Sequence, residues 1–135
     1  MTLFLDANVI IYLVEGATAV REAVQRTLDA QREANESARL AVSRLSWLEC
    51  KVRPLREQNR RALKAYDEFF AAPDLVTVEL TAPLVEAATQ LRAVLNLSTP
   101  DALQAASALQ IAGPVRFFSN DRRLAKVPGL VVESV

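Results

Sequence analysis

Residues 2–14 read TLFLDANVIIYLV, and this stretch decides the fold class. Thr2 to Leu5 is a short apolar run that stops at Asp6, which is the pattern of a buried strand. Asn8 to Val14 continues as a nearly all-apolar helix, which we expect to end near Gly16. A buried strand followed at once by an apolar helix is typical of an α/β fold.

The same alternation continues along the rest of the chain. We expect further strands at Arg39–Val42, Leu75–Leu80, Val115–Phe118 and Leu130–Val132. We expect helices at Val20–Asn35, Leu45–Val52, Leu55–Phe70, Leu84–Leu95, from Thr99 towards Gly113, and at Asp121–Lys126, with a break at Pro54 and caps at Thr81 and Thr99. The pattern predicts a single domain over residues 1–135, with a central parallel sheet of about five strands between two layers of helices.

The composition limits the chemistry that this chain can perform. It has no histidine and one cysteine, which excludes histidine general bases, Ser-His-Asp triads and cysteine zinc sites. Sixteen basic residues balance sixteen acidic ones, so the net charge does not indicate a nucleic-acid partner. An enzyme of this composition depends on carboxylates, amides, hydroxyls or metal ions bound by oxygen.

The sequence carries no membrane or export signal that we can identify. Its longest apolar stretches are far shorter than a membrane span, and the N-terminus lacks the basic and apolar regions of a signal peptide. We therefore expect a cytoplasmic protein without a membrane partner.

Two acidic residues directly follow expected strands. Asp6 ends the first strand, and Asp121 follows the strand VRFF through Ser119 and Asn120. Ligands of open α/β sheets bind beyond the carboxyl ends of the strands, so both acids lie where a site is expected. Each is equally explained as a helix cap or turn residue.

Two further acids occupy helices. Glu49 falls on the apolar stripe of Leu45, Leu48 and Val52, where a hydrophobic residue is expected, although pairing with a nearby cation or a different helix phase would also explain it. Asp101 follows Thr99 and Pro100 in a first helical turn, where acids are common because of the helix dipole.

The four acids are more informative together than singly. At separations of about 5 Å and an effective dielectric constant near 20, each pair of carboxylates would repel by ~3 kcal/mol. Such a cluster would require protonation or bound cations, and oxygen ligands alone favour Mg²⁺ or Mn²⁺.

Four segments in this order resemble the PIN-domain ribonucleases, specifically VapC-type toxins of bacterial type II toxin–antitoxin pairs. The matching segments are LDANVIIYL, SRLSWLEC, TPDALQAASAL and FFSNDRRL, and they span essentially the whole chain. The resemblance implies a PIN-like three-layer α/β/α fold and a metal-dependent endoribonuclease that hydrolyses RNA phosphodiester bonds with metal-activated water. It also implies a homodimer and an antitoxin protein partner.

The resemblance also implies residue roles. Asp6 and Asp101 would be the main Mg²⁺ or Mn²⁺ ligands, and Glu49 and Asp121 would complete the catalytic pocket. Asn8 and Ser119 would support it through hydrogen bonds. Arg122 and Arg123 lie beside the expected pocket and are candidates for RNA contacts. Many relatives carry a histidine where this chain has Gln104, which leaves the role of that position open.

Two other functions remain open at this stage. One is a PIN-like binding or assembly module without catalysis, although all four acids are present. The other is a phosphatase with Asp6 as an aspartyl nucleophile, but such enzymes usually carry a second aspartate where this chain has Asn8.

Overall fold

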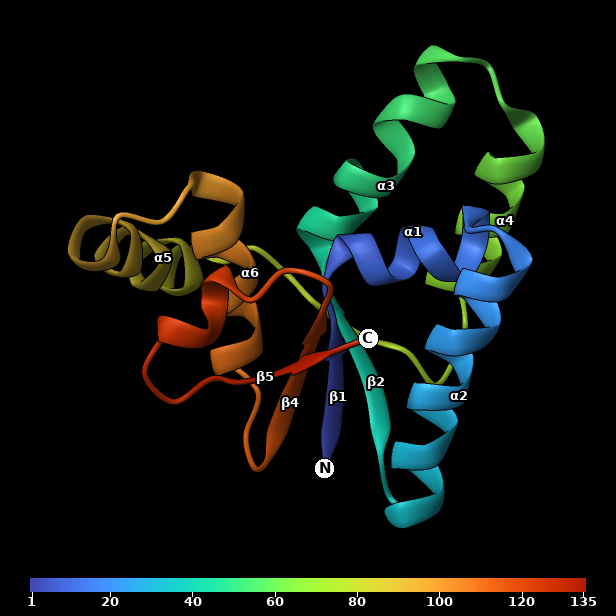
Figure 1. The fold of residues 1–135 in the computed structure, drawn as a ribbon. Helices are drawn as coiled ribbons and strands as arrows, with labels where there is room; N and C mark the ends of the chain where they lie inside the picture. Colours follow the sequence, from blue (N-terminus) through green and yellow to red (C-terminus); the bar gives the residue numbers. More distant parts are fainter.

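Five parallel strands form the centre of the molecule in a computed structural model that describes residues 1–135 (Figure 1). The strands are β1 (Thr2–Leu5), β2 (Arg39–Ser43), β3 (Val76–Val78), β4 (Val115–Ser119) and β5 (Val131–Ser134). They lie in the order β3-β2-β1-β4-β5, and every neighbouring pair is parallel. The predicted parallel sheet of about five strands is confirmed.

Helices cover both faces of this sheet. They are α1 (Ala7–Glu15), α2 (Thr18–Ala34), α3 (Arg44–Arg56), α4 (Arg60–Phe70), α5 (Ala82–Leu95), α6 (Thr99–Leu109) and the 3₁₀ helix η1 (Arg123–Lys126). Figure 1 shows α5, α6 and η1 on one side of the sheet and α1, α2 and α4 on the other, while α3 rises beyond the strand ends. The predicted three-layer α/β/α class is confirmed. No helix combines the length and the apolar character needed to cross a membrane.

Two hydrophobic clusters fill the spaces between the layers. Side chains alternate between the faces of a strand, so Phe4 of β1 packs towards α5 and α6 while Leu3 and Leu5 pack towards α1 and α2. Phe4 stacks on Phe117 of β4 with ring centroids 5.4 Å apart. Because β1 is covered on both faces, all four of its residues are buried, which explains its apolar run from Leu3 to Leu5.

The strand order reverses at β1. The chain leaves β1 to build β2 on one side and later returns to build β4 on the other. In doubly wound folds such a reversal opens a crevice at the carboxyl ends of the strands. Asp6 directly follows β1 and Ser119 ends β4, so both lie at this crevice.

Several predicted helix boundaries were wrong. Helix α3 continues through the buried Pro54 to Arg56, because a proline in the last turn removes only one hydrogen bond of the helix. The expected helix over residues 55–70 begins only at Arg60, after a turn in which Gln58 has a φ of 53° and the Asn59 side chain caps α4. Ser98, not Thr99, caps α6, since its Oγ accepts the Asp101 backbone N–H. The Thr81 cap of α5 is confirmed.

Candidate active site

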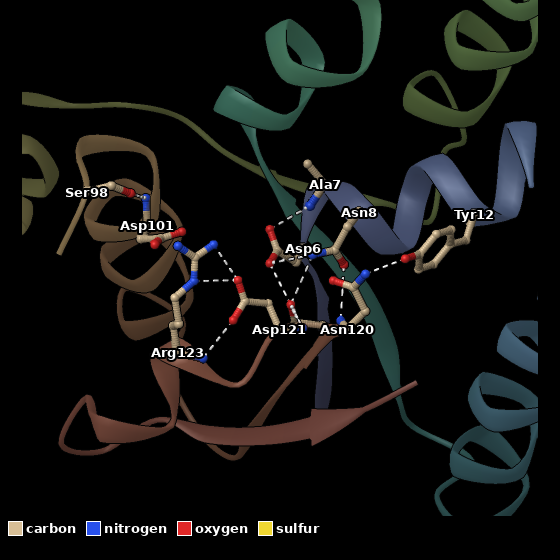
Figure 2. A network of polar contacts seen from close by, with 10 residues as sticks. Asp6, Ala7, Asn8, Tyr12, Ser98, Asp101, Asn120, Asp121 and Arg123 are labelled. Atoms are coloured by element: carbon tan, nitrogen blue, oxygen red, sulfur yellow. Dashed lines mark hydrogen bonds and ion pairs between the residues drawn. The ribbon is translucent and has the colours of Figure 1, made fainter.

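Asp6 is a half-buried acid at the carboxyl end of β1, where the strand order reverses. It caps α1 with extended backbone angles, and its Oδ1 accepts the backbone N–H of Ala7 at 2.8 Å. Its Oδ2 accepts hydrogen bonds from the Ser119 hydroxyl at 2.8 Å and from the Asn8 amide at 3.3 Å (Figure 2). No basic side chain pairs with it. The helix-cap role of Asp6 is therefore confirmed.

Ser119 and Asn8 tie the ends of β1 and β4 together. The Asn8 amide also donates to Ser119 Oγ at 3.2 Å, and Ser119 Oγ accepts the Asp121 backbone N–H at 3.0 Å. The Asn8 Oδ1 accepts the backbone N–H of Asn120 at 3.3 Å. Ser119 is fully buried, and the hydrogen bonds from Ser119 and Asn8 fix the orientation of the Asp6 carboxylate.

Asp121 lies beside Asp6 but already has a cationic partner. Its Oδ1 accepts the Arg123 backbone N–H at 2.9 Å, and its Oδ2 accepts Arg123 Nε at 2.6 Å. These hydrogen bonds hold the pKa of the Asp121 carboxyl below its usual range. Figure 2 shows the Arg123 guanidinium between the side chains of Asp121 and Asp101.

Glu49 reaches the site from α3, for a different reason than the sequence suggested. The expected apolar stripe faces solvent, with Leu48 60% and Val52 45% exposed, and the buried positions of α3 are Ser46, Cys50 and Pro54. The predicted helix phase was therefore wrong. Glu49 is half-buried beside the true inner face.

Gln104 of α6 holds Glu49 in place. Its Nε2 donates to Glu49 Oε1 and to Ser46 Oγ, both at 2.9 Å. Gln104 is 2% exposed, and its Oε1 has no hydrogen-bond partner, which is costly for a buried polar atom. The sequence analysis did not predict this contact. It could have been suspected because Gln104 is a long polar side chain among the small residues of the helix, three residues after Asp101.

The electrostatics of the site follow from burial and mutual repulsion. The pKa of Asp6 is raised, and burial is the largest cause. The hydrogen bonds from Ser119 and Ala7 lower this pKa, and the negative charges of Asp101 and Asp121 raise it further. The pKa of Glu49 is also raised mainly by burial; the hydrogen bond from Gln104 lowers it, and the charges of Asp6 and Asp101 raise it. The four acids therefore share one field at the carboxyl end of the sheet.

The residues present suit a hard divalent cation. The donors are carboxylate, amide and hydroxyl oxygens, which Mg²⁺ and Mn²⁺ prefer, and Asp6, Glu49 and Asp101 have no cationic partner. The unpartnered Oε1 of Gln104 is a further free oxygen beside Glu49. In the present arrangement, however, no group of three or more Asp, Glu or Cys side chains is close enough to hold one ion. The acids share an electrostatic environment, and closer approach would require side-chain movement.

The two arginines expected near the pocket point in different directions. Arg123 turns towards the acids, whereas Arg122 donates to the Ser134 hydroxyl on β5 at 3.1 Å. Their contacts with RNA stay predictions. Sequence reasoning also missed Tyr12, whose hydroxyl accepts a hydrogen bond from the Asn120 amide at the rim of the site.

Solved structures of toxin–antitoxin complexes share this fold. VapBC2 from Rickettsia felis, bound to a promoter DNA fragment, contains a chain with a TM-score of 0.78 and 18% identity, covering 99% of this chain and 98% of that chain. A chain of a toxin–antitoxin complex from Klebsiella pneumoniae matches with a TM-score of 0.70 and 21% identity, over 97% and 96% of the two chains. VapC20 from Mycobacterium tuberculosis, a toxin that cleaves the sarcin-ricin loop, matches with a TM-score of 0.68 and 19% identity, over 92% and 95%. A comparison with curated protein sequences finds no match.

The sheet order and the covering helices define an α/β/α domain with the fold of these structures. The family model of the PIN domain matches residues 3–130, which is nearly the whole chain. The protein therefore belongs to the PIN domain family.

Proposed function

We propose that this protein is a divalent-metal-dependent endoribonuclease and the toxin of a toxin–antitoxin pair. The observation that carries the proposal is the state of Asp6, a half-buried carboxylate without a cationic partner that lies in the field of Asp101 and Asp121. Keeping such a charge in the folded protein costs several kcal/mol unless a cation or a proton compensates it. Membership of the PIN family and the likeness to VapC20 support a nuclease.

The roles that we assign to the side chains come from the resemblance to the family. Asp6 and Asp101 would hold Mg²⁺ or Mn²⁺ from facing sides of the crevice, and Glu49 and Asp121 would complete the set of oxygens. Such an ion, when bound, activates water and stabilises the charge that develops on the scissile phosphate. Ser119 and Asn8 orient the Asp6 carboxylate through their hydrogen bonds.

The chain has no histidine, and the role that we assign to its side chains is to bind and position. The Asp6 carboxylate is fixed by the Ala7 backbone N–H and Ser119, which leaves little freedom to reorganise during the reaction. The resemblance to PIN-domain ribonucleases implies that water, and not the 2′-hydroxyl of the RNA, is the nucleophile, so cleavage would leave a 5′-phosphate and a 3′-hydroxyl. Determining whether each cut end carries a 5′-phosphate and a 3′-hydroxyl is therefore a direct test of the reaction type.

Antitoxin binding and dimerisation are also part of the proposal. The VapBC2 and Klebsiella structures are toxin–antitoxin complexes. On this chain, Leu48, Val52 and Leu55 form an exposed apolar stripe along α3, with Leu55 59% exposed. An apolar stripe of this kind is typical of a surface that a protein partner covers. Co-expression with the product of the neighbouring upstream reading frame, followed by co-purification, tests this interaction.

The main experiment measures RNA cleavage by wild type, Asp6→Asn and Asp101→Asn with Mg²⁺ or Mn²⁺. We expect cleavage by wild type that stops on chelation, and a loss of at least 100-fold in both variants, comparable to other electrostatic deletions in active sites. Full activity in either variant would remove that residue from the site. Sequencing the ends of RNA that is cut after brief induction would identify the substrate.

A wild-type protein that cleaves no RNA at any metal concentration and shows no thermal shift with Mn²⁺ would support the binding-module alternative instead. A trapped acyl-phosphate on Asp6 would support the phosphatase. The second outcome is disfavoured by Asn8, which donates to Asp6 Oδ2 where those enzymes usually place another acid.

A further inference from the structure

A concave basic pocket lies next to the acidic site, on the side of Asp101. It is lined by Arg92, Asn96, Leu97, Ser98, Asp101, Arg123 and Lys126, and its volume is about 530 Å³. We propose that this pocket binds a phosphodiester group of the RNA that neighbours the one being cleaved, with Arg92 and Lys126 as its ligands. The inference rests on the proposed function and extends it to a second subsite.

The charge of the pocket favours an anion. Three of its side chains are cationic and one is a carboxylate. Arg123 shares its charge with Asp121, but neither Arg92 nor Lys126 forms an ion pair with any acidic side chain. Two uncompensated cations in one hollow are an electrostatic site for a phosphate.

Both cations are held in position by backbone carbonyl groups. Arg92 Nη1 donates to the carbonyl oxygen of Leu97 at 2.5 Å, and Lys126 Nζ donates to that of Leu95 at 3.0 Å. These carbonyls flank Asn96, which has a φ of 55° and turns the chain from α5 into α6. Each cation uses one donor in this way, so the guanidinium and the ammonium both keep donors for a ligand. Because the side chains are already ordered, a phosphate would bind with a smaller entropic cost.

The pocket is continuous with the acidic site. Asp101 and Arg123 line the pocket and also lie in the electrostatic environment of Asp6. Figure 2 shows the two side chains facing each other at the edge of that site, with Ser98 behind Asp101. In this proposal, an RNA strand with one phosphate at Asp6 extends past Asp101 and Arg123 and places its next phosphate at Arg92 and Lys126. The acids alone would repel the RNA backbone, and the two cations would hold it there.

The test compares Arg92→Gln and Lys126→Gln with Arg26→Gln, a variant of an exposed arginine of α2 that has no acidic partner. Binding of single-stranded RNA is measured with chelator present, and cleavage is measured with Mn²⁺. We expect each pocket variant to raise the RNA Kd and KM about tenfold, with kcat changed less than twofold. The slope of log K against log salt is negative, and its magnitude should decrease by about 0.7 for each lost phosphate contact with a single strand. Arg26→Gln should change neither the RNA Kd nor this slope.

Further variants and controls separate a failure of the subsite from a failure of the nuclease proposal and from a folding defect. Arg92→Lys retains the charge and should preserve most of the salt slope, whereas a collapse of the α5–α6 turn in Arg92→Gln would appear as a lower melting temperature that Lys126→Gln does not share.

If wild type cleaves RNA and both pocket variants bind it as wild type does, the subsite is wrong and the nuclease stands. If wild type binds RNA through Arg92 and Lys126 but does not cleave, the nuclease is wrong and the subsite stands. Inorganic phosphate serves as the competing ligand: a thermal shift that needs Arg92, without any effect of Arg92→Gln on RNA, would assign the pocket to a free anion and overturn the proposal.

Discussion

Arg123 holds the carboxylate of Asp121 through its side chain and its backbone at once. Nε and Nη2 contact Oδ2 at 2.6 and 2.5 Å, and the backbone N–H of Arg123 contacts Oδ1 at 2.9 Å (Figure 2). The charges of Asp121, Asp101 and Asp6 raise the pKa of Arg123, with the hydrogen bond to Asp121 as the largest cause. A cation of the chain itself thus already neutralises part of the acidic site.

The first prediction concerns competition between this cation and a metal ion. Arg123→Gln removes a positive charge that occupies Asp121, so the Mn²⁺ concentration at the midpoint of thermal stabilisation should fall about three- to tenfold, following the linkage between binding and stability. Arg122→Gln is the matched control, because Arg122 contacts Ser134 and not an acid. Equal midpoints in the two variants would show that Arg123 does not compete with the ion.

The second prediction concerns Glu49 and pH. The raised pKa of Glu49 means that its folded state binds a proton more readily than its unfolded state, so its contribution to stability falls as pH rises above ~4.3. In chelator at pH 8, Glu49→Gln should therefore melt about 2–4 °C higher than wild type, a typical shift for a small gain in a domain of this size. The difference should vanish near pH 4, and the response to Mn²⁺ should weaken.

Glu22→Gln on α2 provides the control for that experiment, since Glu22 is exposed and has no cationic partner. It should follow the wild-type melting curve at both pH values. A Glu49→Gln protein that melts below wild type at pH 8 would show that the carboxylate stabilises the metal-free fold.

The third prediction concerns the core that positions α5 and α6. Leu84→Ala creates a cavity beside Phe4 and Ala88 and should lower the free energy of unfolding by about 2–5 kcal/mol. Val94→Ala on the same helix removes a side chain that is 77% exposed and should change it by less than about 0.5 kcal/mol. Chemical denaturation followed by circular dichroism measures both. Similar losses in the two variants would contradict the burial assigned to Leu84.

The fold was predictable because its central strands are short apolar runs. Leu3, Phe4 and Leu5 of β1 are all apolar, and covering helices on both faces explain why. The strand β2 was also predicted almost to the residue, since it too lies inside the sheet. The local sequence is enough to predict such strands, because a central strand that is buried on both faces requires apolar residues.

The environment of Glu49 was less predictable because helix α3 extends beyond the sheet (Figure 1). Periodicity locates an apolar stripe, but it does not say whether the protein itself covers that stripe. Here Leu48 and Val52 are exposed, whereas the small polar Ser46 is fully buried and accepts a hydrogen bond from Gln104. Gln104 is 55 positions from Glu49 and 58 positions from Ser46 in the sequence. Such pairings depend on tertiary packing, which no local sequence pattern contains.

The last prediction tests that pairing. Gln104→Leu removes the donor to Glu49 Oε1 and Ser46 Oγ, so two buried or half-buried groups lose their partner and the free energy of unfolding should fall by about 1–3 kcal/mol. Gln110→Leu at the exposed end of the same helix should cost much less. A double-mutant cycle with Glu49→Ala, which removes the accepting oxygen, isolates the contact, and we expect a coupling energy of about 1 kcal/mol in chelator. If Gln104 positions Glu49 for the reaction, Gln104→Leu also lowers kcat while the RNA Kd stays at the wild-type value. A coupling near zero, or a kcat equal to that of Gln110→Leu, would show that the amide fills space on α6 without orienting the acid.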